Sequence, residues 1–128
     1  MGYSLLSIIA ERAAGKNFEV YLNFVLHALS IENSGISLVD ESGLAKGYTL
    51  DKTSNTWFSL NDYPDFFKDK NLSILLGSGS MYSTAPDMMS WIQALKNNEV
   101  LSNDMFDLML KPNLNNYGYG WALNKMGN

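Results

Sequence analysis

The stretch Leu75-Leu76-Gly77-Ser78-Gly79-Ser80-Met81-Tyr82-Ser83-Thr84-Ala85-Pro86-Asp87-Met88 carries the clearest structural signal in this 128-residue sequence. Thr84, followed three residues later by Asp87, is typical of a capping box, and Pro86 is tolerated in a first helical turn. The pattern therefore predicts a helix that begins just after Thr84 and ends near Asn97-Asn98. Its predicted apolar face consists of Met88, Trp91, Ile92 and Leu95.

Three further helices are predicted outside this stretch. Between residues 3 and 14, Leu5, Leu6, Ile9 and Ala13 recur at helical spacing, and Gly15 follows where a left-handed cap would end a helix. Asn17 is a candidate N-cap for a second helix, with apolar positions at Phe18, Tyr21, Leu22, Val25, Leu26 and Leu29. After Ser102, a third helix is indicated by Met105, Phe106, Met109 and Leu110, and Pro112 ends it.

The remaining segments favour short strands and loops. Residues 33–63 contain Gly, Ser and Asn between short runs such as Ile36–Val39 and Tyr48–Leu50, which predicts irregular structure with one or two short strands. A short helix is expected around Asp65–Lys70, after Tyr63-Pro64. Residues 117–123 alternate glycine and aromatic residues and predict a lone strand, as if cut from a larger sheet. The sequence thus predicts a single domain over residues 1–128, mainly α with short β segments.

Composition excludes several classes of function. Nine basic and 13 acidic residues give a net charge of -4, and no basic stripe fits a phosphate backbone, so nucleic acid is excluded as a partner. The absence of cysteine excludes disulfides and thiolate chemistry. No apolar run reaches the roughly 20 residues of a membrane span. The first residues lack a basic region, so we expect no signal peptide within the chain.

Motifs for metals and cofactors are incomplete. His27 is the only histidine and lies off the apolar face of its predicted helix, which indicates a surface residue. Gly77-Ser78-Gly79 lacks the third glycine of a dinucleotide loop, and no Gly-Lys-Ser/Thr follows it. Asp62, Asp65 and Asp69 lack the spacing and the glycine of a calcium loop. We therefore expect no metal and no cofactor.

Four segments together resemble a known family. They are Gly2-Tyr3-Ser4-Leu5-Leu6 through Ala14-Gly15-Lys16, Leu44-Ala45-Lys46-Gly47-Tyr48, Gly79 to Asp87 with Trp91, and Tyr117-Gly118-Tyr119-Gly120-Trp121. In this order they resemble the serine β-lactamase and penicillin-binding-protein family, most closely the branch of class C β-lactamases, D-Ala-D-Ala peptidases and related esterases. The chain departs from the family pattern at Ala28-Leu29-Ser30-Ile31, where "PLGM" is usual, and at Ser80, where the family has a second glycine.

The resemblance implies acyl-enzyme chemistry that needs Ser-x-x-Lys, Tyr-x-Asn or Ser-x-Asn, and Lys-Thr-Gly or His-x-Gly, because serine is a weak nucleophile without an adjacent base. No serine of this chain has lysine three residues later. Tyr21-Leu22-Asn23 lies inside a predicted helix, where residues two apart point to different sides, and Lys52-Thr53-Ser54 lies in a polar loop. We therefore expect an internal fragment, inactive in isolation, with all three catalytic motifs outside it.

By resemblance, the fold is the helical lobe of a β-lactamase-like domain with one terminal strand, from an exported or cell-envelope bacterial protein. The resemblance also implies that a turn flanks the substrate cleft, formed by Gly79, Ser80, Met81, Tyr82 and Ser83, although a helix entry that merely needs small residues explains it equally well. Expected partners are the remainder of the parent enzyme, a β-lactam or D-Ala peptide in the intact protein, and a second copy bound through the terminal strand around Trp121. The alternative is a freestanding, non-catalytic module that binds a peptide or a protein.

Overall fold

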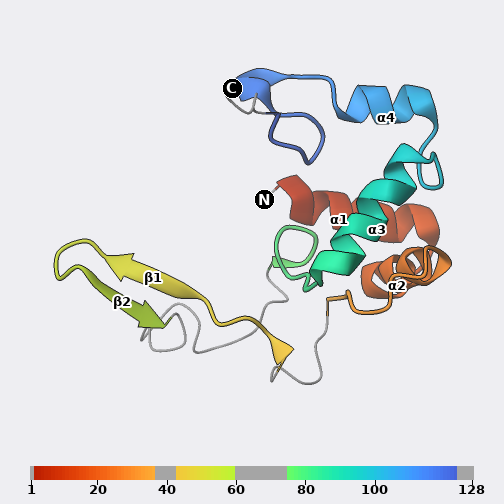
Figure 1. Cartoon of the computed structure of the whole chain (residues 1–128). Helices are drawn as coiled ribbons and strands as arrows, with labels where there is room; N and C mark the ends of the chain where they lie inside the picture. The colour runs from red at the N-terminus through yellow and green to blue at the C-terminus, as the bar shows by residue number, and fades with distance from the viewer. Residues whose placement is uncertain (1, 37–42, 60–74, 124–128) are drawn as a thin grey trace. The chain divides into compact units, whose positions relative to one another are not determined.

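The computed structural model describes residues 2–36, 43–59 and 75–123, and these are mostly helical with one two-stranded antiparallel sheet (Figure 1). They belong to two compact units: Met1–Tyr21 with Gly35–Tyr82, and Leu22–Ser34 with Ser83–Asn128. The single domain predicted over residues 1–128 stays a prediction. The helix expected at Asp65–Lys70 and most of the strand expected at Ile36–Val39 lie outside the described residues.

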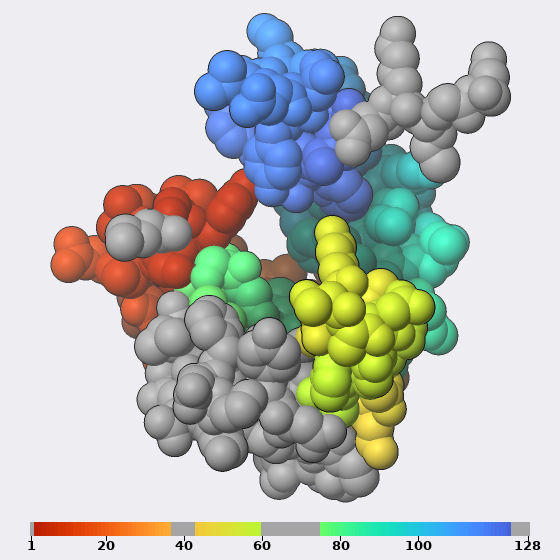
Figure 2. Space-filling model, turned by 90° about the vertical axis from the view of Figure 1, so that its left-hand side faces the viewer, coloured from red at the N-terminus to blue at the C-terminus, as the bar shows by residue number. Residues whose placement is uncertain are grey.

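Helix α1, Gly2–Ala14, belongs to the first unit and ends as predicted at Gly15, whose φ of 62° is left-handed. The apolar residues predicted to share one side of α1 are exposed to solvent: Leu5, Leu6 and Ile9 are 59%, 55% and 52% exposed. The covered side instead carries Ser7, which is 3% exposed. The loop at residues 75–79 lies against this small, polar side of α1 (Figure 2).

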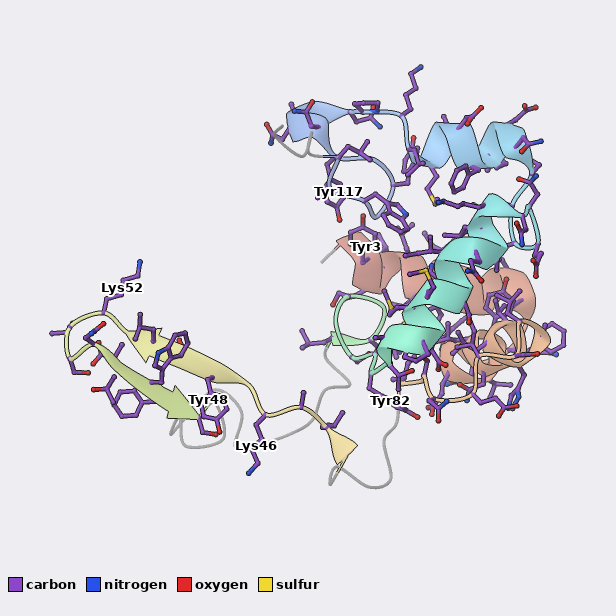
Figure 3. All side chains as sticks on the ribbon, viewed as in Figure 1. Tyr3, Lys46, Tyr48, Lys52, Tyr82 and Tyr117 are labelled. Carbon is purple, nitrogen blue, oxygen red and sulfur yellow. The ribbon has the colours of Figure 1, made fainter. Side chains whose placement is uncertain are left out.

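The sheet of the first unit is a hairpin of β1, Tyr48–Asp51, and β2, Thr56–Ser59. Tyr48 pairs with Ser59 and Asp51 with Thr56. The predicted strand at Tyr48–Leu50 is confirmed, whereas β2 was not predicted. The loop between the strands is held by Asp51, which accepts hydrogen bonds from the Thr53 N–H at 2.8 Å and the Ser54 hydroxyl at 2.7 Å. Lys52 lies at this turn, and Lys46 lies before β1 (Figure 3).

Helix α2, Phe18–Ala28, runs from the first unit into the second, where α3, Ala85–Lys96, and α4, Asn103–Met109, follow. The buried apolar side chains of the described residues all lie in the second unit: Leu26, Ile31, Ala94 and Leu95. As predicted, Thr84 caps α3, α3 ends before Asn97, and α4 begins after Ser102; the Ser102 side chain caps α4. Met88, on the predicted apolar face of α3, is 50% exposed, whereas Asp87 beside it is buried and accepts the Asn33 N–H.

The segment at residues 117–123 is not the lone strand that the sequence predicts. After a short 3-10 helix, Leu114–Asn116, the chain reverses through Gly120, whose φ is 86°. Tyr117 then forms an isolated antiparallel bridge with Ala122, and the Gly118 N–H bonds to the Trp121 carbonyl at 2.8 Å. The backbone groups of this segment therefore pair locally, and the expected self-association through it stays a prediction.

Among the described residues, no helix has both the length and the apolar character that crossing a membrane requires.

Candidate functional site

The first part of the predicted cleft-flanking turn, residues 79–82, is fixed at both ends. On the N-terminal side, the Ser78 and Gly79 N–H groups both bond to the Leu75 carbonyl, at 2.7 and 3.0 Å. On the C-terminal side, Tyr82 forms an antiparallel bridge with Gly35, with N–H···O distances of 2.9 and 3.1 Å. A Cβ at Gly35 would lie 2.8 Å from the Tyr82 hydroxyl, so Gly35 gives the tyrosine ring room to cover the bridge (Figure 3).

Gly77 lets this loop approach α1. Its φ of 75° lies in the left-handed region, and an added Cβ would lie 2.6 Å from the Ser7 Cβ and 2.8 Å from the Tyr3 carbonyl oxygen. Two side chains link the same segments: Ser4 Oγ donates to Ser78 Oγ at 3.3 Å, and Ser7 Oγ, which donates to the Ser4 carbonyl at 2.8 Å, also lies 3.5 Å from the Leu76 carbonyl oxygen. The loop is therefore held by backbone and small-residue contacts.

Within this turn, Ser80 is only 4% exposed, and its hydroxyl has no hydrogen-bond partner among the described residues. Met81, the next residue, is 52% exposed. A serine nucleophile needs an adjacent base, and among the described residues no base contacts the Ser80 hydroxyl.

The last residue of the predicted turn, Ser83, belongs to the second unit and joins a chain of hydroxyls that ends on Asp87. The Ser34 hydroxyl donates to Asp87 Oδ2 at 2.8 Å, and the Asn33 N–H donates to the same oxygen at 2.7 Å. The Ser83 and Ser34 hydroxyl oxygens are 2.7 Å apart. Because Ser34 donates to the carboxylate, its oxygen can accept the Ser83 proton, and Ser83 Oγ also lies 3.3 Å from the Thr84 carbonyl, to which it can donate instead.

The Asp87 side chain therefore does not form the second half of the predicted capping box; it accepts hydrogen bonds from residues 33 and 34 instead. Thr84 Oγ1 accepts the Asp87 N–H at 3.3 Å, which confirms the cap. The Asp87 carboxylate, however, holds residues 33–34 rather than turning back to the Thr84 N–H. Sequence reasoning missed Ser34 in this role, because only the fold brings residues 34 and 87 together.

The other residues weighed from sequence are not part of a site among the described residues. His27 is exposed on α2, as predicted. Tyr21 lies inside α2 and Lys52 lies at the hairpin turn, as the sequence predicted for these two look-alike motifs. No cluster of His, Asp and Glu side chains in the described ranges could hold a metal ion.

Comparison with known proteins identifies relatives. No protein-family model matches the chain. Penicillin-binding protein 4* of Bacillus subtilis is 28% identical over 138 residues, an alignment that takes in 95% of this chain. The chain is a distant homologue of a penicillin-binding protein. It spans 30% of the length of penicillin-binding protein 4*.

Two solved structures share the fold over part of their length. A penicillin-binding protein from Bacillus halodurans superposes with a TM-score of 0.65 at 24% identity, covering 93% of this chain and 37% of the other. A D-amino acid amidase from Ochrobactrum anthropi SV3, solved with D-phenylalanine, gives a TM-score of 0.66 at 20% identity, covering 84% of this chain and 32% of the amidase. The architecture is thus that of a portion of penicillin-binding-protein-like structures.

Proposed function

We propose that this chain is a non-catalytic segment of a penicillin-binding-protein-like serine hydrolase, the helical lobe of a β-lactamase-like domain. The parent enzyme acts through an acyl-enzyme on β-lactams, D-Ala peptides or esters, and the isolated chain is inactive. One combination of observations carries the proposal: similarity to a penicillin-binding protein extends over 95% of the chain, yet no serine in it has lysine three residues later.

The surroundings of the two serines in the turn support the inactive half of the proposal. A serine nucleophile needs a base within hydrogen-bond reach, commonly about 2.6–3.2 Å away. Ser80 has no polar partner among the described residues, and Ser83 contacts only a hydroxyl and a backbone carbonyl. In the proposal, the nucleophile and its base come from the remainder of the parent enzyme.

In the parent enzyme, residues 79–83 border the substrate cleft in this proposal. Support comes from the local geometry: Gly79 offers no side chain, Met81 is exposed, and the bridge from Tyr82 to Gly35 fixes the backbone directly after Met81. Such a turn can present backbone N–H groups and a flexible thioether to a ligand, but it contributes no reacting atom.

The test is labelling with a fluorescent penicillin. The isolated chain, shown by circular dichroism to be helical, remains unlabelled, while the full-length protein from the source organism forms a covalent band that unlabelled penicillin prevents. A heat-denatured full-length sample is the control for nonspecific reaction. A stable penicilloyl adduct on Ser80 or Ser83 of the isolated chain would show that the chain itself is the catalyst.

A second candidate function is a freestanding module that binds a peptide or a protein. The hairpin favours it, since Trp57 and Tyr48 are 66% and 56% exposed on the same face of the sheet. Size-exclusion chromatography, a thermal melt and dye binding distinguish the two functions. A freestanding module elutes as a monomer and unfolds cooperatively. A segment of a larger domain binds apolar dyes and associates as its concentration rises.

A further inference from the structure

Asn33 is the one asparagine in the sequence that is followed by glycine or serine. An asparagine cyclises when the backbone nitrogen of the next residue attacks its side-chain carbonyl carbon, and a bulky or β-branched side chain on that next residue hinders the attack. Asn55, for comparison, is followed by the β-branched Thr56. The sequence therefore indicates that this ring closes most readily between Asn33 and Ser34.

The structure leaves both reacting groups accessible. Asn33 is exposed in the loop after α2, and its side-chain amide makes no hydrogen bond among the described residues. The Asn33 and Gly35 N–H groups both donate hydrogen bonds, whereas the Ser34 N–H between them has no acceptor in the described part of the chain. The attacking nitrogen therefore has no hydrogen bond to lose, and an exposed side chain needs only to rotate to meet it.

The same two residues are the hydrogen-bond donors to Asp87. The Asn33 N–H lies 2.7 Å from Asp87 Oδ2, and the Ser34 hydroxyl oxygen lies 2.8 Å from the same atom. Asp87 is only 7% exposed, and all three residues belong to the second compact unit. Because both donors share one oxygen, their positions depend on the length of the backbone between residues 33 and 34, which a reaction at Asn33 would change.

We propose that Asn33 is a site of spontaneous deamidation, and that its conversion to isoaspartate detaches Ser34 from Asp87. The Ser34 nitrogen bonds to Asn33 Cγ, the Cγ–NH₂ bond breaks, and ammonia leaves with the proton of the Ser34 N–H, which yields a succinimide. Water then opens the ring at either carbonyl and gives aspartate or isoaspartate. Isoaspartate lengthens the main chain by one methylene and adds a carboxylate beside Asp87, so the Ser34 hydroxyl moves away from it. Water is the sole co-reactant, so the proposal does not depend on the proposed function.

The test follows the 128-residue chain during incubation at mildly acidic and mildly alkaline pH, with peptide mapping by tandem mass spectrometry. Asn55 in the same digest is the internal reference. Ser34→Thr keeps a hydroxyl for Asp87 but adds a methyl group that hinders the attack. Asn33→Gln keeps the amide but requires a larger ring, so it stays unconverted. Asn33→Asp adds the new charge without lengthening the main chain.

We expect Asn33 to convert at least about tenfold faster than Asn55, faster at alkaline than at acidic pH, and about tenfold more slowly in Ser34→Thr. The isoaspartate form, separated by ion exchange, should melt below both the unconverted chain and Asn33→Asp, while Asn33→Gln keeps its melting temperature throughout. Conversion of Asn33 no faster than that of Asn55 would overturn the site. An isoaspartate form that melts with the unconverted chain or with Asn33→Asp would overturn the detachment of Ser34 by the longer backbone.

Discussion

Gly77→Ala tests the contact between the loop and α1, because the substitution adds one methyl group at the closest approach. The new Cβ would lie 2.6 Å from the Ser7 Cβ and 2.8 Å from the Tyr3 carbonyl oxygen, about 0.8 and 0.6 Å closer than the 3.4 Å of ordinary contact. The Tyr3 oxygen belongs to the backbone of α1 and cannot rotate away. The loop must therefore separate from the helix.

Two costs add in this variant. A non-glycine residue in the left-handed region costs about 1–2 kcal/mol, and forcing a methyl group into a filled space costs about 1–3 kcal/mol. We expect Gly77→Ala to lower the free energy of unfolding by about 2–5 kcal/mol, measured by urea titration followed by circular dichroism. Hydrogen exchange of the α1 amides should accelerate in parallel.

Two other glycines separate these costs. Gly15 has a φ of 62° with open space around it, so Gly15→Ala should cost only about 1–2 kcal/mol. Gly79 lies in the same loop with ordinary space, its Cβ 4.0 Å from the Leu75 Cδ1, so Gly79→Ala should change stability by less than about 1 kcal/mol. If Gly77→Ala costs no more than Gly15→Ala, the loop does not contact α1 as described.

Three further predictions follow from individual side chains. Ser80→Ala should leave the free energy of unfolding unchanged or raise it by up to about 1 kcal/mol, because it removes a buried hydroxyl without a partner among the described residues. In the same urea assay, Ser7→Ala should lower the free energy of unfolding by about 0.5–1.5 kcal/mol, because it loses a 2.8 Å bond to the Ser4 carbonyl. Equal losses in the two variants would contradict this difference. Asp87→Asn should lower the free energy of unfolding by about 1–2 kcal/mol, because a charged acceptor of two hydrogen bonds becomes neutral. An unchanged melting temperature would contradict the hydrogen bonds from residues 33 and 34 to Asp87. The Ser54 hydroxyl and then the Thr53 N–H lower the pKa of Asp51, so the stability that this carboxylate gives the hairpin loop is present above the ordinary value of 3.8 and is lost as the pH falls below it; an NMR titration of the Thr53 amide that centres at 3.8 or higher would refute this.

Local signals in the sequence predicted the helix boundaries well. Thr84 and Ser102 cap helices through their own side chains, and Gly15 adopts the left-handed conformation that ends α1. These devices depend on neighbours within four residues, so a single sequence contains all the information that they need.

Which helical side is covered could not be predicted from periodicity. The spacing of Leu5, Leu6 and Ile9 identifies an apolar face, but it does not say whether the covering layer lies among the same 128 residues. Within this chain, the side that contacts a neighbour carries Ser7, because Gly77 lets a backbone loop approach there.

Contacts between distant residues were also beyond sequence reasoning. The bond from Ser34 to Asp87 joins positions 53 residues apart, and the bridge from Gly35 to Tyr82 joins positions 47 residues apart. At the C-terminal end, alternating Gly and aromatic residues indicated a strand, whereas the left-handed Gly120 reverses the chain and Tyr117 pairs with Ala122. The alternation of glycine and aromatic residues therefore did not reveal that the backbone turns back at Gly120.

The most direct test of the central claim is to find which serine of the full-length protein becomes acylated. The full-length protein is incubated with penicillin, its intact mass is measured, and the modified peptide is sequenced by tandem mass spectrometry. The account predicts a single penicilloyl adduct on a serine that has lysine three residues later and lies outside these 128 residues. An adduct on Ser80 or Ser83, or a full-length protein that forms no adduct, would contradict it.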